Sequence, residues 1–373
     1  MSQTKVEAPF VENNLHFKNL LINGDFAIAQ RSTAAVAAGN GTYTTLDRMK
    51  TFLGNTSGAY TTAQTALSAA DQATTGQIFA LDIQCTTADT SIASNAYVMV
   101  RQHIEAQNCQ HLLYGSSAAK TLTLSFYVKS NLTGTTTGCI IKNDSTAQSF
   151  LFEYTINSAN TWEKKVIKVT PPTNGGTIND DNGEGLIVQW NLHIGSSYLG
   201  GSNLTWDETN SYYGTTNTLN VLSSTDNDLF IAGMQLEVGD VASEFEHLPR
   251  DIQLRRCMRY FVSYSTNVGD QPLIPEGDSY ISNGFMYTSS NMISVIHLPV
   301  PMNHRPDLTT TNSSGTFQFY RNGAGDALDD LTLSTSSSNI ACGIYNSSDA
   351  SGTAGHAGGL YLSAGTMTFE AEL

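Results

Sequence analysis

The sequence predicts a mainly β protein in which a short helix separates two β regions of antiparallel sandwich type. Three observations lead to this prediction: short segments of alternating polarity, Gly/Asn/Thr-rich turns between them, and one segment with helical periodicity. Short strands joined by such turns are typical of antiparallel sandwiches. At 373 residues the chain exceeds one ordinary domain, so two domains are expected.

The clearest strand is predicted over residues 120–129. Its apolar residues fall on alternate positions, as in a half-buried strand: Leu122, Leu124, Phe126 and Val128. Residues 186–194 alternate in the same way, with Leu186, Val188, Trp190, Leu192 and Ile194 on one side. A further strand ends with Phe230, Met234 and Leu236. Residues 1–18 lack periodicity and are expected to form an arm that orders against a partner.

A short basic helix is predicted after Pro249. Its apolar residues share one face at spacings of three and four: Leu254, Cys257, Met258 and Phe261. Asp251 suits the N-terminal turn, where free N–H groups favour an acid. Arg255, Arg256 and Arg259 lie on another face. They form either a solvated or salt-bridged face or an anchor against a neighbouring subunit.

β character returns beyond the helix. Residues 292–300 read as a strand that is broken or held at an edge by Pro299, Pro301 and Pro306. Residues 346–359 suggest a surface loop, and residues 360–373 a closing strand pair. The expected organisation is therefore an arm at 1–18, a β domain at 19–248, a connecting helix at 249–264 and a C-terminal β domain at 265–373.

Composition argues against several classes of protein. Only 14% of residues are charged, compared with about 25% in ordinary globular chains. The formal charge of -15 argues against nucleic-acid binding, which needs a concentrated Lys/Arg surface, and otherwise indicates solubility. Most of the five scattered cysteines are expected to be small buried side chains in a reducing compartment. We expect no secretory signal and no membrane insertion.

No sequence motif for catalysis or nucleotide binding occurs, so no catalytic residue is predicted and the protein is not expected to be an enzyme. No cofactor is expected. The adjacent Asp47 and Arg48 could form a buried or a surface ion pair, with catalysis a remote third choice. Asp180, Asp181 and Glu184 surround a glycine turn and could offer oxygen ligands to a structural Ca²⁺. A plain polar turn is the competing interpretation.

The loop over residues 196–216 is rich in aromatic residues: Tyr198, Trp206, Tyr212 and Tyr213. Exposed aromatic rings can stack on sugar faces, because they offer apolar area with a polar edge. They can equally fill the core or a subunit interface, where Tyr and Trp are enriched. Both interpretations remain open from the sequence.

Four colinear segments carry a family resemblance. They are residues 19–26 (NLLINGDF) with Gln30–Arg31 and Asp47–Arg48; residues 101–105 (RQHIE) with Leu113, Gly115 and 121–129; residues 190–197 (WNLHIGSS); and residues 229–261. Together they resemble the jelly-roll domain of tailed-phage tail-fibre and virion-surface proteins. Met49 departs from the pattern, because the family often has Trp there. This change is expected to alter core packing or one groove wall.

The resemblance implies a jelly roll similar to carbohydrate-binding modules of the cellulose- and xylan-binding type. It also implies a phage virion structural protein, located on the virion after assembly in the host cytoplasm. The expected protein is a tail fibre or fibre-like surface protein that contacts host-surface polysaccharide. It would form a homo-oligomer, expected to be a trimer, and join other virion proteins through its N-terminal arm. The alternatives are a head-decoration or adaptor protein without host contact, and a glycan depolymerase.

Overall fold

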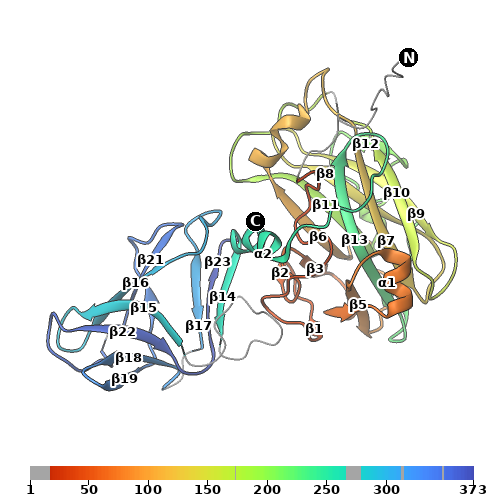
Figure 1. Ribbon diagram of the computed structural model, residues 1–373. Helices are drawn as coiled ribbons and strands as arrows, with labels where there is room; N and C mark the ends of the chain where they lie inside the picture. Colours follow the sequence, from red (N-terminus) through yellow and green to blue (C-terminus); the bar gives the residue numbers. More distant parts are fainter. Residues whose placement is uncertain (1–16, 173, 266–278, 312–314, 347) are drawn as a thin grey trace, which may run out of the picture.

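The computed structural model describes residues 17–172, 174–265, 279–311, 315–346 and 348–373. It is mainly β, with two sandwich-like units side by side and α2 (Arg250–Met258) between them (Figure 1). All of the named strand pairs in the described chain are antiparallel. The fold class predicted from the sequence is confirmed. Residues 1–16 of the expected arm lie outside the described residues.

The first unit is a jelly-roll sandwich of two sheets. One sheet has the order β1 (Val36–Ala37), β4 (Ala59–Ala66), β5 (Phe79–Thr87), β13 (Asp228–Val238), β7 (Leu122–Ser130) and β10 (Glu163–Val169). The other has the order β12 (Thr205–Asp207), β9 (Gln148–Ile156), β8 (Gly134–Lys142), β11 (Glu184–Ile194), β6 (Tyr97–Glu105), β3 (Lys50–Gly54) and β2 (Thr42–Tyr43). Short helical segments connect them: α1 (Ala69–Thr75), η1 (Ala106–Leu112), η2 (Ser196–Tyr198) and η3 (Val221–Ser223).

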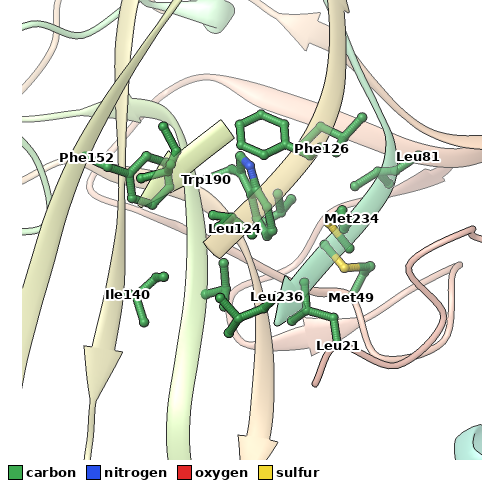
Figure 2. Close-up of a cluster of buried hydrophobic side chains, with 14 of the residues drawn as sticks. Leu21, Met49, Leu81, Leu124, Phe126, Ile140, Phe152, Trp190, Met234 and Leu236 are labelled. Atoms are coloured by element: carbon green, nitrogen blue, oxygen red, sulfur yellow. The ribbon is translucent and has the colours of Figure 1, made fainter. Parts of the chain in front are cut away.

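The inward side chains of the two sheets meet in one core (Figure 2). The apolar residues predicted on one face of β7, and the first four predicted on β11, lie in this core. The prediction of half-buried strands was wrong, because polar residues of the opposite faces such as Thr123 and Gln189 are buried as well. Trp190 on β11 meets Phe126 on β7 edge to face, with ring centroids 5.7 Å apart. Met49 is also buried in this core, so the departure at this position affects core packing and not a groove wall.

The second unit also contains two sheets. The smaller has the order β14 (Phe261–Ser265), β23 (Thr366–Glu370) and β17 (Asp307–Thr310). The larger has the order β19 (Ala324–Leu328), β18 (Phe317–Arg321), β22 (Ala357–Leu362), β15 (Ser279–Met286), β16 (Met292–His297), β21 (Ala341–Tyr345) and β20 (Thr332–Leu333). These sheets enclose a second apolar core.

Two local expectations at this end of the chain were wrong. The strands β22 and β23 do not pair with each other, because each lies between two other strands in a different sheet. The helix ends at Met258, and Phe261 begins β14 opposite Glu370. Strand pairing with a distant segment therefore takes precedence over the local helical spacing of Phe261.

The N-terminal segment of the jelly roll contributes to both cores. Leu21 and Phe26 lie in the first core, whereas Ile22 and Ile28 pack in the second, with Leu254 of α2. Residues of one short segment therefore serve both units. The domain boundaries expected at residues 248 and 265 stay a prediction.

A buried ion pair joins the two units. Arg48 is completely buried and bonds to the Glu372 carboxylate, which also accepts a bond of 3.1 Å from Arg31. Burial lowers the pKa of Arg48, but the Glu372 carboxylate together with the Tyr43, Tyr260 and Cys257 side chains outweighs this effect and raises it. The Arg48 guanidinium also lies 3.5 Å from the ring centroid of Tyr260. Arg48 therefore forms a buried ion pair, as one of the sequence-based interpretations expected, but its partner is Glu372 and not Asp47.

Asp47 is buried as well, and it bonds to a different residue. Its Oδ1 accepts a bond from the backbone N–H of Gln30, 2.9 Å away, and its Oδ2 accepts one from the Gln30 side chain. Burial raises the pKa of Asp47 to about 6. Asp47 and Arg48 therefore do not pair with each other. Of the two, it is Arg48 that bonds to the second unit.

Replacing Trp190 with Ala should destabilise the jelly roll by about 3–5 kcal/mol, because it leaves a cavity beside Phe126. Denaturant unfolding followed by circular dichroism would measure this loss. Val166→Ala on β10 is the control, since Val166 is exposed and such changes usually cost less than about 0.5 kcal/mol. An equal loss in both variants would contradict the assigned core.

Replacing Glu372 with Gln should cost about 3–5 kcal/mol, because it leaves the Arg48 charge buried without a counter-charge. Thermal or denaturant unfolding would measure the loss. Glu370→Gln is the matched control: Glu370 also contacts Arg31, at 3.4 Å, but its side chain is 47% exposed. A surface pair of this kind contributes about 1 kcal/mol or less. Equal effects of the two substitutions would refute a dominant role for Glu372.

Candidate functional site

A groove lies on the outer face of the jelly-roll sheet that contains β6. It has a volume of about 310 Å³ and is lined by aromatic, amide and guanidinium side chains. Its lining residues are Asn40, Gly41, Phe52, Tyr97, Met99, Arg101, Tyr198 and Tyr213. This volume falls within the range of about 300–1,000 Å³ found for small-ligand sites. We therefore treat this groove as the candidate binding site.

Strand alternation explains why these residues share one face. Val98 and Val100 of β6 point into the core, so Tyr97, Met99 and Arg101 between them point outward. In the antiparallel register of β3 and β6, Phe52 lies opposite Met99. The floor of the groove is thus built from two adjacent, well-paired strands.

A glycine on β3 makes room for one wall of the groove. Gly54 is the register partner of Tyr97, and a Cβ at this position would lie 2.3 Å from the Tyr97 ring. Any larger residue would therefore push the ring away from β3. The Tyr97 ring meets Tyr198 of η2 edge to face, with centroids 6.2 Å apart.

The second wall is a loop that lies across the sheet. The ring of Tyr213 stacks on that of Tyr198, with centroids 5.5 Å apart and planes 25° apart. The backbone N–H of Tyr213 donates to the Tyr198 carbonyl over 2.9 Å. The side chain of Asn191 on β11 donates to the Tyr213 carbonyl over 2.8 Å. These bonds hold the two rings in a fixed orientation.

Arg101 lines the groove between two aromatic rings. Its guanidinium is 4.6 Å from the centroid of Phe52 and 5.5 Å from that of Tyr213. Its Nε donates to Gln189 Oε1 over 2.6 Å. The side chain of Arg101 is therefore held between two rings and an amide, with further N–H groups able to donate to a ligand.

The four aromatic residues singled out from the sequence separate in the structure. Tyr198 and Tyr213 line the groove, as the glycan-contact interpretation requires. Trp206 instead packs against Phe150 of the core, and its indole N–H donates to the Thr170 carbonyl over 2.6 Å. Tyr212 packs on a small apolar cluster over β8, β9 and β11, which Tyr213 also contacts from the groove. For Trp206 and Tyr212 the packing interpretation describes the structure.

Sequence reasoning did not select Phe52, Tyr97 or Arg101. Two of these residues, Tyr97 and Arg101, alternate with buried valines on β6, and this pattern could have indicated an outward aromatic and cationic face. Phe52 lies on a five-residue strand, where the alternation is too short to be informative. Only the pairing of β3 with β6 brings Phe52 beside Arg101.

A buried histidine and a carboxylate continue this face of the sheet beyond the groove. The Nδ1 of His103 lies 2.6 Å from Oε1 of Glu184, and Asn143 donates to Oε2 of Glu184 over 3.0 Å. Burial lowers the pKa of His103. The hydrogen bond from His103 lowers the pKa of Glu184. At neutral pH this is a neutral histidine donating to an ionised carboxylate.

The structure does not bring the three suggested calcium ligands together. Glu184 is engaged by His103, Asp181 Oδ1 accepts the backbone N–H of Gly183 over 2.9 Å, and Asp180 is exposed. Among the described residues, the group of three ligand-type side chains within reach of one ion is Asp329, Asp330 and Asp349, in the second unit. At residues 180–184 the polar-turn interpretation is the one that describes these contacts.

Two of the three arginines near α2 are engaged within the chain. Arg259 forms bonds of 2.6 and 2.9 Å to the buried carboxylate of Glu105. Arg256 donates to the Asn19 carbonyl over 3.2 Å, whereas Arg255 is exposed. Their role as anchors between subunits stays a prediction. The five cysteines are all buried and unbridged, as expected.

Comparison with known proteins gives matches at the level of structure alone. No family model matches the chain, and no curated protein does. Among solved structures, a protein of Bacteroides thetaiotaomicron described as sugar-binding has a TM-score of 0.34 at 13% identity, over 59% of this chain and 100% of that one. The xylan-binding domain of a Paenibacillus barcinonensis protein has a TM-score of 0.28 at 12% identity, over 52% and 92%.

The enzymatically active domain of a tailspike from bacteriophage CBA120 also matches, with a TM-score of 0.28 and 13% identity. This match covers 60% of this chain and 22% of that one. Because these scores and identities are low, the function of this chain must be argued from its own groove. Among the described helices, none has the length and apolar character needed to cross a membrane.

Protonation of His103 should destabilise the fold. Its lowered pKa means that the unfolded chain binds the proton first, below about pH 6.5, so its contribution to stability is lost as pH falls. Replacing His103 with Gln removes this contribution. The difference in unfolding free energy between parent and variant should therefore decrease from pH 7.5 to pH 5. A difference that stays constant over this range would contradict the assignment.

Proposed function

We propose that the protein is a glycan-binding protein of a phage particle surface, and that the groove is its saccharide site. The observation that carries this proposal is the arrangement of Phe52, Tyr97, Tyr198 and Tyr213 around the guanidinium of Arg101. Aromatic rings offer apolar faces to the C–H faces of a pyranose, and Arg and Asn side chains donate hydrogen bonds to its hydroxyl groups.

The rigidity of the groove supports this proposal. Its floor is paired β-strand, and its loop wall is held by Asn191 and by the bond between Tyr213 and Tyr198. A site that is already formed loses little conformational entropy on binding. This benefits a saccharide, which offers many hydroxyl groups but little apolar area.

The placement on a virion rests on the four colinear segments that resemble tailed-phage fibre and surface proteins. Within the groove proposal, the protein is a fibre or fibre-like component that contacts host-surface polysaccharide. Immunogold labelling of intact particles with an antibody to the C-terminal unit tests the position. Label on the fibres supports the proposal, and label confined to the capsid would favour a head-decoration protein.

We propose that the groove binds without cleaving its ligand. Its lining residues include no carboxylate pair, which glycoside hydrolysis ordinarily requires. Incubation with bacterial capsule or lipopolysaccharide should release no reducing sugar. Release of reducing sugar that is abolished by a substitution in the groove would establish the depolymerase alternative instead.

Replacing Phe52 or Tyr213 with Ala should weaken saccharide binding by about tenfold, equivalent to about 1.4 kcal/mol for one stacking contact. Affinity electrophoresis in gels containing soluble xylan, mixed-linkage β-glucan, galactan or lipopolysaccharide would identify the ligand, and calorimetry would measure the change. Tyr287→Ala is the control, because Tyr287 is an exposed tyrosine on the second unit, away from the groove. Equal retention of parent and groove variants would refute the site.

A further inference from the structure

The larger sheet of the second unit has one buried face and one exposed face. Met292 and Ile296 on β16 are buried in the core, whereas Val295 between them is 45% exposed. The exposed face carries large apolar side chains on each of five neighbouring strands. These are Tyr320 on β18, Tyr361 on β22, Tyr280 and Phe285 on β15, Val295 on β16 and Tyr345 on β21. We call these residues the outer aromatic face.

Three tyrosines at one end of this face form a packed cluster. Tyr280 and Tyr361 are cross-strand partners, with ring centroids 5.2 Å apart, and Tyr320 lies 5.3 Å from Tyr361. A Cβ at Gly359 would lie 2.6 Å from the Tyr280 ring, so glycine is required where this ring crosses the sheet. The cluster is therefore ordered, although 64% of Tyr280 remains exposed.

The charge distribution sets this face apart from the rest of the unit. Residues 261–373 contain ten acidic and two basic residues. None of the acidic residues lies on β15, β16, β18, β21 or β22. The one arginine on these strands, Arg321, forms a 2.6 Å ion pair with Asp326. A strongly acidic unit thus has a neutral, aromatic sheet face.

The extent of the face favours a macromolecule over a small ligand. Tyr320 and Tyr345 lie on strands separated by four strand spacings in the sheet, which corresponds to about 19 Å at about 4.8 Å per strand. One sugar ring would cover only part of this width. Large exposed apolar areas of this kind mark sites of protein association, where tyrosine is enriched.

We propose that the outer aromatic face binds the same face of a second copy of this chain. Each copy carries a formal charge of -15, so the acidic surfaces of two copies repel one another. The strands of the outer aromatic face carry no acidic side chain, so two copies can approach there without this repulsion. A basic partner would instead be attracted to the acidic surfaces around it. Contact of like faces about a two-fold axis removes apolar area from water on both copies, and it is a contact separate from the trimer that the family resemblance implies.

This proposal does not depend on the saccharide groove, which lies on the other unit. Sedimentation velocity and light scattering of the full chain over a range of concentrations test it directly. The parent should show a mass above 40.1 kDa that rises with concentration. Association should strengthen as salt is raised, because salt screens the repulsion between acidic copies.

Substitutions at both ends of the face make the test specific. Tyr280→Asp and, separately, Val295→Asp should raise the dissociation constant at least about tenfold, equivalent to 1.4 kcal/mol. Val241→Asp is the matched control, because Val241 is 75% exposed but lies on the jelly roll. Circular dichroism would verify that each variant is folded. Two positions are used so that a folding failure at one leaves the other informative.

Two results would overturn the proposal. The parent could remain at the mass of one chain at all concentrations, or both face variants could associate as the parent does. If the parent is monomeric and Tyr280→Asp also loses retention on one of the polysaccharides named above, the face is assigned to glycan contact. The groove variant Tyr213→Ala should keep the mass of the parent, which separates failure of this proposal from failure of the groove.

Discussion

The arrangement of the two units depends on neutralising one buried charge. Arg48 follows the segment that opens the jelly roll, whereas Glu372 lies beyond β23. A guanidinium without a counter-charge is costly to bury, so the last strand of the second unit must return to the jelly roll. The Lys50 side chain reinforces this contact by donating to the Leu373 carbonyl over 2.7 Å. The contact lies on β3, the strand that also carries Phe52 of the groove.

The two proposed surfaces use the same structural device for different purposes. In each, one face of an antiparallel sheet forms the core and the opposite face presents aromatic rings, with a glycine leaving room for a ring. In the groove, Gly54 makes room for Tyr97, and Arg101 adds hydrogen-bond donors suited to hydroxyl groups. On the outer aromatic face, Gly359 makes room for Tyr280, and the five strands that carry the face have no acidic side chain. The difference in polar groups is what separates a saccharide site from a protein interface.

Local pattern predicted the fold better than it predicted the site. The alternation of β7 and β11 identified residues that are buried, because a sheet face in contact with a core must be apolar along its whole length. The prediction of calcium ligands rested on neighbouring carboxylates alone. It did not include His103, which is 81 residues from Glu184 in sequence and bonds to it. Trp206 and Tyr212 likewise pack against strands that no local pattern could assign as their neighbours.

By itself the sequence determined the strand periodicity, the position of the connecting helix, the burial of the cysteines and the acidic character of the chain. These properties depend on residues close together along the chain. The tertiary structure alone decided which distant residues meet. The pairing of β3 with β6 assembled Phe52 and Arg101 into a groove, and the return of Glu372 to Arg48 joined the units. Such contacts follow from strand order and register, which residue spacing does not encode.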